Sequence, residues 1–139
     1  MKLLFICTHN RCRSTLCEAI ANQRGKGVLI AASAGSAPVE SVHPLTLRYL
    51  SERGYDTAGL RSQSWHDLDG FHPDRVITVC DNAAGEVCPL WMKGTPKHHW
   101  GLIDPSRVEG DASSIHEAFM AVIDQIEAKV KEWAHEARY

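Results

Sequence analysis

The chain has 139 residues, of which 44% are hydrophobic and 23% are charged, and its formal net charge is -2. This length predicts a single domain over residues 1–139 that can bury a core without a disulfide or a metal. The near-neutral charge and the lack of an apolar run of about 18 residues argue against nucleic acid and membrane partners, so we expect a cytoplasmic monomer. The odd number of cysteines, 5, indicates reactive or buried thiols rather than a disulfide framework.

Strand and helix patterns alternate along the chain. The apolar run Lys2–Ile6 is too short for a helix and predicts a buried strand, and apolar residues at helical spacing then follow until glycines interrupt them. The predicted elements are, in order, a strand over Lys2–Ile6, a helix that begins at Ser14 and ends near Gly25 and Gly27, a strand over 28–32, a helix that begins between Ser41 and Pro44 and ends at Gly54, a strand over 75–79, a strand over 98–102 and a C-terminal helix that begins at Ser114.

The C-terminal helix has the clearest pattern. Its apolar residues recur every three or four positions and form one face, which comprises Ile115, Phe119, Ile123, Ile126, Val130, Trp133 and Ala137. Ser114 and Glu117 predict a capping box at its start. The alternation of strands and helices predicts an α/β fold of three layers, with helices on both faces of a four-stranded parallel sheet in a flavodoxin-like order. Functional sites in such folds lie beyond the carboxyl ends of the strands.

The segment 7–14, which reads Cys-Thr-His-Asn-Arg-Cys-Arg-Ser, connects the first predicted strand to the first predicted helix. Backbone N–H groups in such a loop, together with the helix dipole, bind a tetrahedral oxyanion. The same field lowers the pKa of a cysteine thiol, so we expect Cys7 to be a nucleophile. Arg13 can donate two parallel hydrogen bonds to phosphate or arsenate, and Ser14 can donate to the thiolate. The alternative interpretation is structural: Cys7 is a buried strand residue and Arg13 is a solvated charge at the start of the helix. The candidate oxyanion-binding loop comprises Thr8, His9, Asn10, Arg11, Cys12, Arg13 and Ser14.

This loop resembles the phosphate-binding loop of the low-molecular-weight protein tyrosine phosphatases, and the resemblance covers essentially the whole chain. It implies the fold of that family and a structural role for Asn10 in holding the shape of the loop. It also implies that Asp104, which is followed by Pro105, is the general acid. Proline restricts the preceding residue to an extended backbone, which helps to hold the carboxyl group in place. Without the cysteine loop, the same dipeptide would indicate an ordinary turn.

A second pair of cysteines, Cys80 and Cys88, follows the third predicted strand. Cys80 stands at the carboxyl end of that strand, as Cys7 does for the first strand, and adjacent strands lie about 4.8 Å apart, so these two cysteines are expected within disulfide reach. Across an α-helix Cys80 and Cys88 would be about 12 Å apart. Segment 81–87 mixes helix formers with Asn and Gly, so we infer that it rearranges to bring them together. The alternative is that both are packed as small hydrophobic residues.

The sequence around these cysteines resembles the thioredoxin-coupled arsenate reductases that are built on the phosphatase fold. The motifs that carry the resemblance are Val79-Cys80-Asp81, Cys88-Pro89, His99-Trp100-Gly101 and Asp104-Pro105. The resemblance implies that Cys7 attacks arsenate, that Asp104 protonates the departing oxygen, and that Cys80 then attacks Cys7 to release arsenite. It further implies that Cys88 resolves the product to a redox disulfide, Cys80 with Cys88, which thioredoxin reduces. Phosphate and sulfate are the expected oxyanion mimics.

The reductant and the reaction both have alternatives. Some related reductases couple to glutathione and glutaredoxin, and in either case the resemblance implies an external thiol reductant and no bound organic cofactor. The main alternative reaction is that of a tyrosine phosphatase that uses Cys7, Arg13 and Asp104 alone. Such phosphatases usually carry an aromatic residue after the Asp-Pro pair, where this chain has Ser106. A third reading is a thiol-based sensor or anion-binding protein that binds without turnover.

Two further features of the sequence remain open. Cys12 matches a loop cysteine that in phosphatases forms a protective disulfide with the nucleophile, and the alternative is a buried thiol. The 8 histidines show no ligand spacing, so we expect no metal site. Some relatives bind potassium near residues that Asn10, Glu18 and Ser33 resemble, but the match weakens around 63–65, so no ion is assigned.

Overall fold

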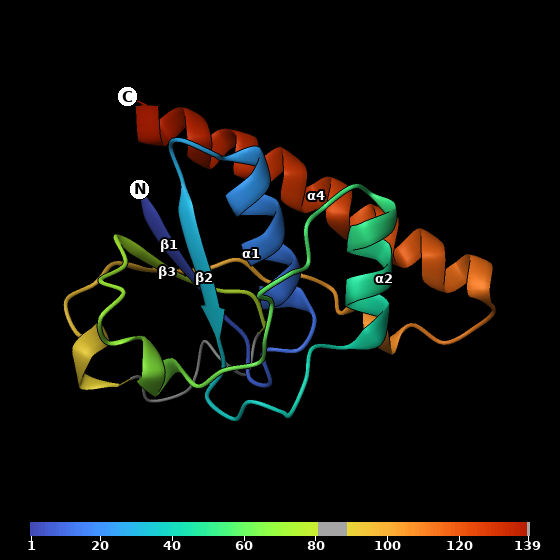
Figure 1. The fold of residues 1–139 in the computed structure, drawn as a ribbon, viewed down its shortest axis with the longest axis horizontal. Coiled ribbons are helices and arrows are strands. Elements are labelled where there is room, and N and C mark those ends of the chain that lie inside the picture. The colour runs from blue at the N-terminus through green and yellow to red at the C-terminus, as the bar shows by residue number, and fades with distance from the viewer. Residues whose placement is uncertain (81–88, 139) are drawn as a thin grey trace.

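The computed structural model describes residues 1–80 and 89–138 of the chain (Figure 1). At its centre is a parallel sheet in the order β2-β1-β3-β4, whose strands are β1 (Lys2–Ile6), β2 (Ile30–Ala34), β3 (Arg75–Thr78) and β4 (Lys97–His99). The predicted α/β fold and the flavodoxin-like strand order are therefore confirmed. Residues 3–6 of β1 are all buried, as expected for a central strand of a parallel sheet.

Three helices, α1 (Arg13–Arg24), α2 (Pro44–Glu52) and α4 (Ala112–Arg138), pack on one another beside the sheet (Figure 1). The apolar face predicted for α4 is confirmed, because its central apolar side chains are buried. Trp133 packs on Phe5 of β1 with ring centroids 5.5 Å apart, and Phe119 stacks on Tyr49 of α2 at 4.8 Å. These contacts join α4 to both the sheet and α2. Three short 3-10 helices complete the described elements: η1 (Trp65–Leu68), η2 (Leu90–Met92) and η3 (Pro105–Arg107).

Three predicted strands have different bounds in the structure, and the third, predicted over 75–79, ends one residue earlier at Thr78. The second strand begins two residues late, because the N–H groups of Val28 and Leu29 donate to the carbonyl of Gly25 and complete a turn after α1. The fourth strand covers Lys97–His99 rather than 98–102. Beyond it, the N–H of Leu102 still donates to Val79 at 3.0 Å, so the chain continues alongside β3 towards the Asp-Pro pair.

The cap predicted for the C-terminal helix is wrong. Ser114 lies inside α4, and its N–H donates to Oδ1 of Asp111 at 2.8 Å. Asp111 is therefore the capping residue, and hydrogen bonding by the Ser114 N–H lowers the pKa of the Asp111 carboxyl group. Gly110, with φ +133, makes the turn that places this aspartate ahead of the helix. Within residues 1–80 and 89–138, no helix is both long and apolar enough to cross a membrane.

Candidate active site

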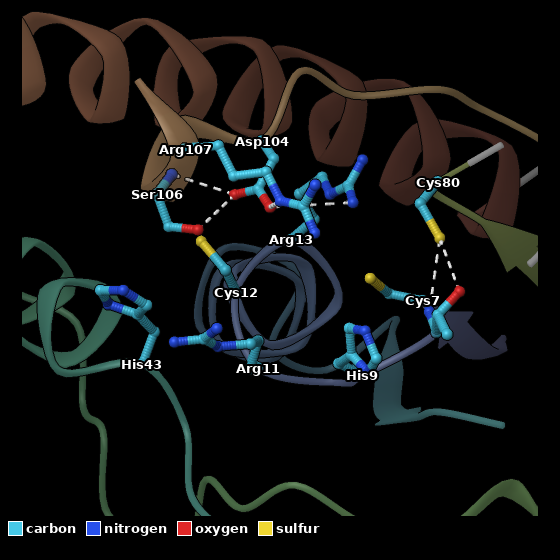
Figure 2. Close-up of a pocket in the computed structure, with 11 residues that line it drawn as sticks. Cys7, His9, Arg11, Cys12, Arg13, His43, Cys80, Asp104, Ser106 and Arg107 are labelled. Carbon is cyan, nitrogen blue, oxygen red and sulfur yellow. Dashed lines mark hydrogen bonds and ion pairs between the residues drawn. The ribbon is translucent and has the colours of Figure 1, made fainter. Parts of the chain in front are cut away.

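The candidate site lies at the carboxyl ends of β1, β2 and β3. Cys7 directly follows β1, and its N–H donates to the carbonyl of Ala34 at the end of β2. The register of β1 and β3 pairs Ile6 with Thr78, so Cys80 reaches the start of the loop. The N–H of Thr8 donates to Sγ of Cys80 at 3.3 Å (Figure 2). The two strand-end cysteines that the sequence places in adjacent strands are therefore together in the folded chain.

Asn10 ties the loop to the rest of the fold. Its backbone adopts a left-handed conformation, φ 50, and its side chain is fully buried. The side-chain amide donates to Oγ of Ser14 at 2.8 Å and to Oγ of Ser33 at 2.9 Å, and its carbonyl accepts the N–H of Gln63 at 2.8 Å. One side chain thus connects the loop to α1, to β2 and to the segment before η1. In the described part of the chain the Ser14 hydroxyl contacts Asn10, and no hydrogen bond joins it to Cys7.

Gly35 lets the loop pass close to the end of β2. A Cβ atom at this position would lie 2.5 Å from the carbonyl oxygen of Thr8 and 2.8 Å from that of Cys7. Both contacts are with backbone, so only a shift of the loop relieves them. We expect Gly35→Ala to cost about 1–3 kcal/mol in the free energy of unfolding and to weaken phosphate binding by about tenfold, which corresponds to 1.4 kcal/mol.

Denaturant unfolding and phosphate titration of the reduced protein measure the two effects of Gly35→Ala. The matched control is Gly70→Ala, because a Cβ there meets no heavy atom within 4 Å. That variant is expected to stay within about 0.5 kcal/mol of the wild-type stability. Equal phosphate affinity in the two variants would show that the loop tolerates the extra methyl group.

Arg13 and Asp104 face each other across the pocket. Nη1 of Arg13 donates to the carbonyl of Leu102 at 3.1 Å, and Nη2 lies 3.8 Å from Oδ2 of Asp104. Nε of Arg13 is buried without a hydrogen-bond partner in the described structure. Buried donors are rarely left unsatisfied, so this N–H is suited to an oxyanion in the loop. Ser106 holds Asp104 through its N–H at 3.0 Å and its hydroxyl at 2.6 Å, both on Oδ1.

The predicted lowering of the Cys7 pKa is wrong for the reduced pair of thiols. Hydrogen bonding to the Cys80 side chain is the largest influence that raises the pKa of the Cys7 thiol, and burial is the next largest. The positive charge of Arg13 and the hydrogen bond from the His9 N–H lower this pKa, but only in part. Two adjacent thiols lose their first proton as a pair. When the negative charge is on Cys80, where the Thr8 N–H stabilises it, loss of a second proton from Cys7 is disfavoured. Attack therefore requires the single thiolate of the pair to reside on Cys7.

The other cysteines differ from this pair. Burial raises the pKa of Cys12 to about 12 and also raises that of the fully buried Cys17, so both thiols stay protonated at neutral pH. In Figure 2 the sulfur of Cys12 points towards Ser106, whereas that of Cys7 points into the pocket below Arg13. This arrangement favours the buried-thiol interpretation of Cys12. Cys88 lies outside the residues that the structure describes, as does the predicted pairing of Cys80 with Cys88.

A cavity of about 120 Å³ lies over the loop. Its described lining residues include most of the predicted site, together with three that the sequence did not indicate, His43, Ser106 and Arg107. Its lining among the described residues is Cys7, Thr8, His9, Arg11, Cys12, Arg13, His43, Cys80, Asp104, Ser106 and Arg107. His43 precedes α2 and Arg107 ends η3, so only the folded chain brings them to the loop, and no sequence pattern marks them. Asn10 and Ser14 also belong to the loop, but both are buried and hydrogen bond to each other rather than line the cavity.

Glu18 and Ser33, which resemble residues near the potassium ion of some relatives, form a hydrogen-bonded chain with Gln63 behind the loop. The hydroxyl of Ser33 donates to Oε1 of Glu18 at 2.8 Å, and burial raises the pKa of Glu18. Gln63 donates to the carbonyl of Ser33 at 2.8 Å. Within the described residues no group of three or more His, Cys, Asp or Glu side chains is arranged to hold a metal ion.

The sheet order, the loop and the pocket define a class of α/β proteins in which an oxyanion-binding loop surrounds a cysteine at the end of the first strand. The chain belongs to the low molecular weight phosphotyrosine protein phosphatase family, which it matches over residues 2–138. The resemblance stated from the sequence is thereby confirmed.

Known relatives within this family include arsenate reductases. That of Shouchella clausii is 32% identical over 132 residues, which is 95% of this chain and 94% of the relative. The glutaredoxin arsenate reductase of Synechocystis is 30% identical over 132 residues, 94% and 93% of the two chains. A solved arsenate reductase in the phosphate binding state has a TM-score of 0.79 at 27% identity and 98% coverage of both chains. The thioredoxin-dependent arsenate reductase of Corynebacterium glutamicum has a TM-score of 0.73 at 30% identity, covering 99% of this chain and 61% of that one.

Proposed function

We propose that the chain is an arsenate reductase that converts arsenate to arsenite through Cys7, Cys80 and Cys88. The observation that carries the proposal is the position of Cys80, which follows the strand beside β1 and whose Sγ accepts the N–H of Thr8, the residue next to Cys7, at 3.3 Å. A hydrolase with a single nucleophile has no use for a second thiol at this point. The similarity to arsenate reductases over nearly the whole chain supports the same function.

In the first step the Cys7 thiolate attacks arsenic. A sulfur–arsenic bond forms, and one arsenate oxygen leaves as water after it takes a proton from Asp104. The backbone N–H groups of the loop and the guanidinium of Arg13 stabilise the charged oxygens. Asp104 is suited to its role because Ser106 holds Oδ1 while Oδ2 faces Arg13.

In the second step Cys80 attacks the sulfur of Cys7. The electron pair of the sulfur–arsenic bond passes to arsenic, which is reduced from As(V) to As(III) and leaves as arsenite, while the two cysteines form a disulfide. Cys88 then attacks Cys80 and releases Cys7 as a thiolate. An external thiol system, thioredoxin or glutathione with glutaredoxin, supplies two electrons to the new disulfide. The electrons therefore come from a partner rather than from a bound cofactor.

A tyrosine phosphatase remains the second candidate function. It is favoured by the geometry of Cys7, Arg13 and Asp104, which suffices for a phosphocysteine intermediate without Cys80. Ser106 argues against phosphotyrosine proteins as substrates. It stands where those phosphatases usually carry an aromatic residue, and here it donates two hydrogen bonds to Asp104.

The test of the proposal is arsenate-dependent NADPH oxidation coupled to thioredoxin and its reductase, with glutathione and glutaredoxin in parallel. We expect Cys88→Ser to lower steady-state turnover at least about 100-fold in both systems, because the Cys7–Cys80 disulfide then has no internal thiol to resolve it. Cys17→Ala is the matched control, since Cys17 is buried in α1 away from the pocket, and it should keep most of the activity.

Two outcomes would contradict the relay. The first is undiminished arsenite production by Cys88→Ser. The second is no arsenite with either reductant system, while wild type and Cys88→Ser hydrolyse an aryl phosphate equally well. That second result would identify the protein as a phosphatase.

A further inference from the structure

The cavity over the loop carries more positive charge than one oxyanion needs. Arg11, Arg13 and Arg107 line it, and among its described lining residues only Asp104 is a carboxylate, although the whole chain has a net charge of -2. Arg13 and Arg107 both lie near Oδ2 of Asp104, at 3.8 Å and 3.5 Å. Within residues 1–80 and 89–138, the side chain of Arg11 makes no ion pair or hydrogen bond. Its charge is therefore available to a ligand.

The backbone of Arg11 is fixed even though its side chain is exposed. Its carbonyl accepts the N–H of His43 at 2.8 Å and the hydroxyl of Thr46 at 3.4 Å, which joins the loop to the start of α2. In Figure 2 the Arg11 guanidinium extends towards the His43 ring and away from Cys7. Arg11 thus faces a different part of the pocket from Arg13.

His43 adds a hydrogen-bond donor beside Arg11. Its Nδ1 accepts the N–H of Leu45 at 3.1 Å and caps α2, so in the neutral ring the proton is on Nε2. Burial and the positive charge of Arg11 lower the pKa of His43, while Asp104 opposes this. The ring is therefore neutral at physiological pH, and its Nε2–H makes no hydrogen bond with the described residues.

We propose that Arg11 and His43 form a second anion subsite at the mouth of the cavity. It would bind a carboxylate or phosphate group of the same small molecule whose oxyanion occupies the loop over Cys7. Guanidinium and imidazole N–H groups are both suited to carboxylate and phosphate oxygens. Arsenate has a single anionic centre and does not fill this subsite, so the inference goes beyond arsenate reduction. It means that small molecules with two anionic groups bind the pocket in preference to those with one.

The test is a binding comparison of phosphonoacetate with phosphonoacetamide, which lacks the carboxylate charge. Calorimetric titration of the reduced full-length protein should show phosphonoacetate binding about 5- to 20-fold more tightly. In Arg11→Gln both ligands should bind more weakly, because Arg11 belongs to the loop, but the preference for phosphonoacetate should fall to about twofold or less. His43→Asn keeps an oxygen to cap α2 but removes the Nε2 donor, and it should give an intermediate preference. Arg48→Gln removes an exposed arginine of α2 that pairs with Glu52, and serves as the matched control.

Equal affinities for the two ligands in the wild type, or a full preference in Arg11→Gln, would overturn the second subsite. Circular dichroism checks that each variant is folded. The titration requires neither arsenate nor electron transfer from thioredoxin or glutaredoxin. A failure of the proposed arsenate reductase activity would therefore leave this result intact, and a failure of the subsite would leave the relay intact.

Discussion

Cys7→Ser is expected to abolish arsenate turnover, with a loss of at least about 10⁴-fold. A serine hydroxyl at this position is a far weaker nucleophile than a thiolate. The loop should still bind oxyanions, because Asn10 and Arg13, which shape and charge it, remain. Arsenite release measures the first effect, and titration with sulfate or phosphate measures the second.

If Cys7→Ser still binds oxyanions, its lost turnover results from the missing nucleophile and not from a disrupted loop. We expect the phosphate affinity of Cys7→Ser to stay within about threefold of wild type. The binding free energy would then change by less than about 1.4 kcal/mol, which corresponds to a tenfold change in affinity. Arsenite release by Cys7→Ser at more than a small fraction of the wild-type rate would place the nucleophile elsewhere. Cys80 is then the first candidate, since it lies against the same loop at the N–H of Thr8.

The anion loop was predictable from a short-range pattern, and the strand order from the general rule for chains in which strands and helices alternate. A buried strand, a polar loop and a helix start are contiguous over residues 2–14, and parallel strands bring their carboxyl ends to one edge of the sheet. His43 and Arg107 were not predictable, because they reach the pocket only when α2 and η3 pack beside the loop. Asp111 was missed as a cap for a local reason: Ser114 with Glu117 matches a capping box equally well, and only the turn at Gly110 decides between them.

The Cys7 pKa shows why the chemistry of a site depends on its neighbours. Considered alone, the loop and Arg13 lower the pKa of the thiol, which was the basis of the sequence prediction. The structure adds Cys80 and burial, which act in the opposite direction and are the stronger influences. The same neighbour that makes a thiol relay chemically reasonable therefore holds Cys7 protonated when Cys80 carries the charge. A chain without Cys80 should ionise Cys7 at lower pH.

Cys80→Ser is expected to stop catalytic arsenite release, with turnover at least about 10³-fold below wild type. Without the Cys80 thiol, no adjacent sulfur can attack Cys7, so the sulfur–arsenic bond formed in the first step is not cleaved reductively. The serine hydroxyl can still accept the Thr8 N–H, so the loop should keep its shape. Because Cys80 is the largest contributor to the raised Cys7 pKa, iodoacetamide should alkylate Cys7 in this variant at lower pH than in wild type.

Rapid-quench measurement of arsenite and mass spectrometry of the trapped thiols distinguish the possible results for Cys80→Ser. Hydrolysis of an aryl phosphate, which needs Cys7, Arg13 and Asp104 but no second thiol, should stay within about fivefold of wild type, a change of about 1 kcal/mol. Cys17→Ala is again the control, because its buried thiol lies in α1 outside the pocket. Steady arsenite release by Cys80→Ser at the wild-type rate would mean that an external thiol attacks the Cys7 adduct directly. The position of Cys80 against the loop would then serve packing rather than electron transfer.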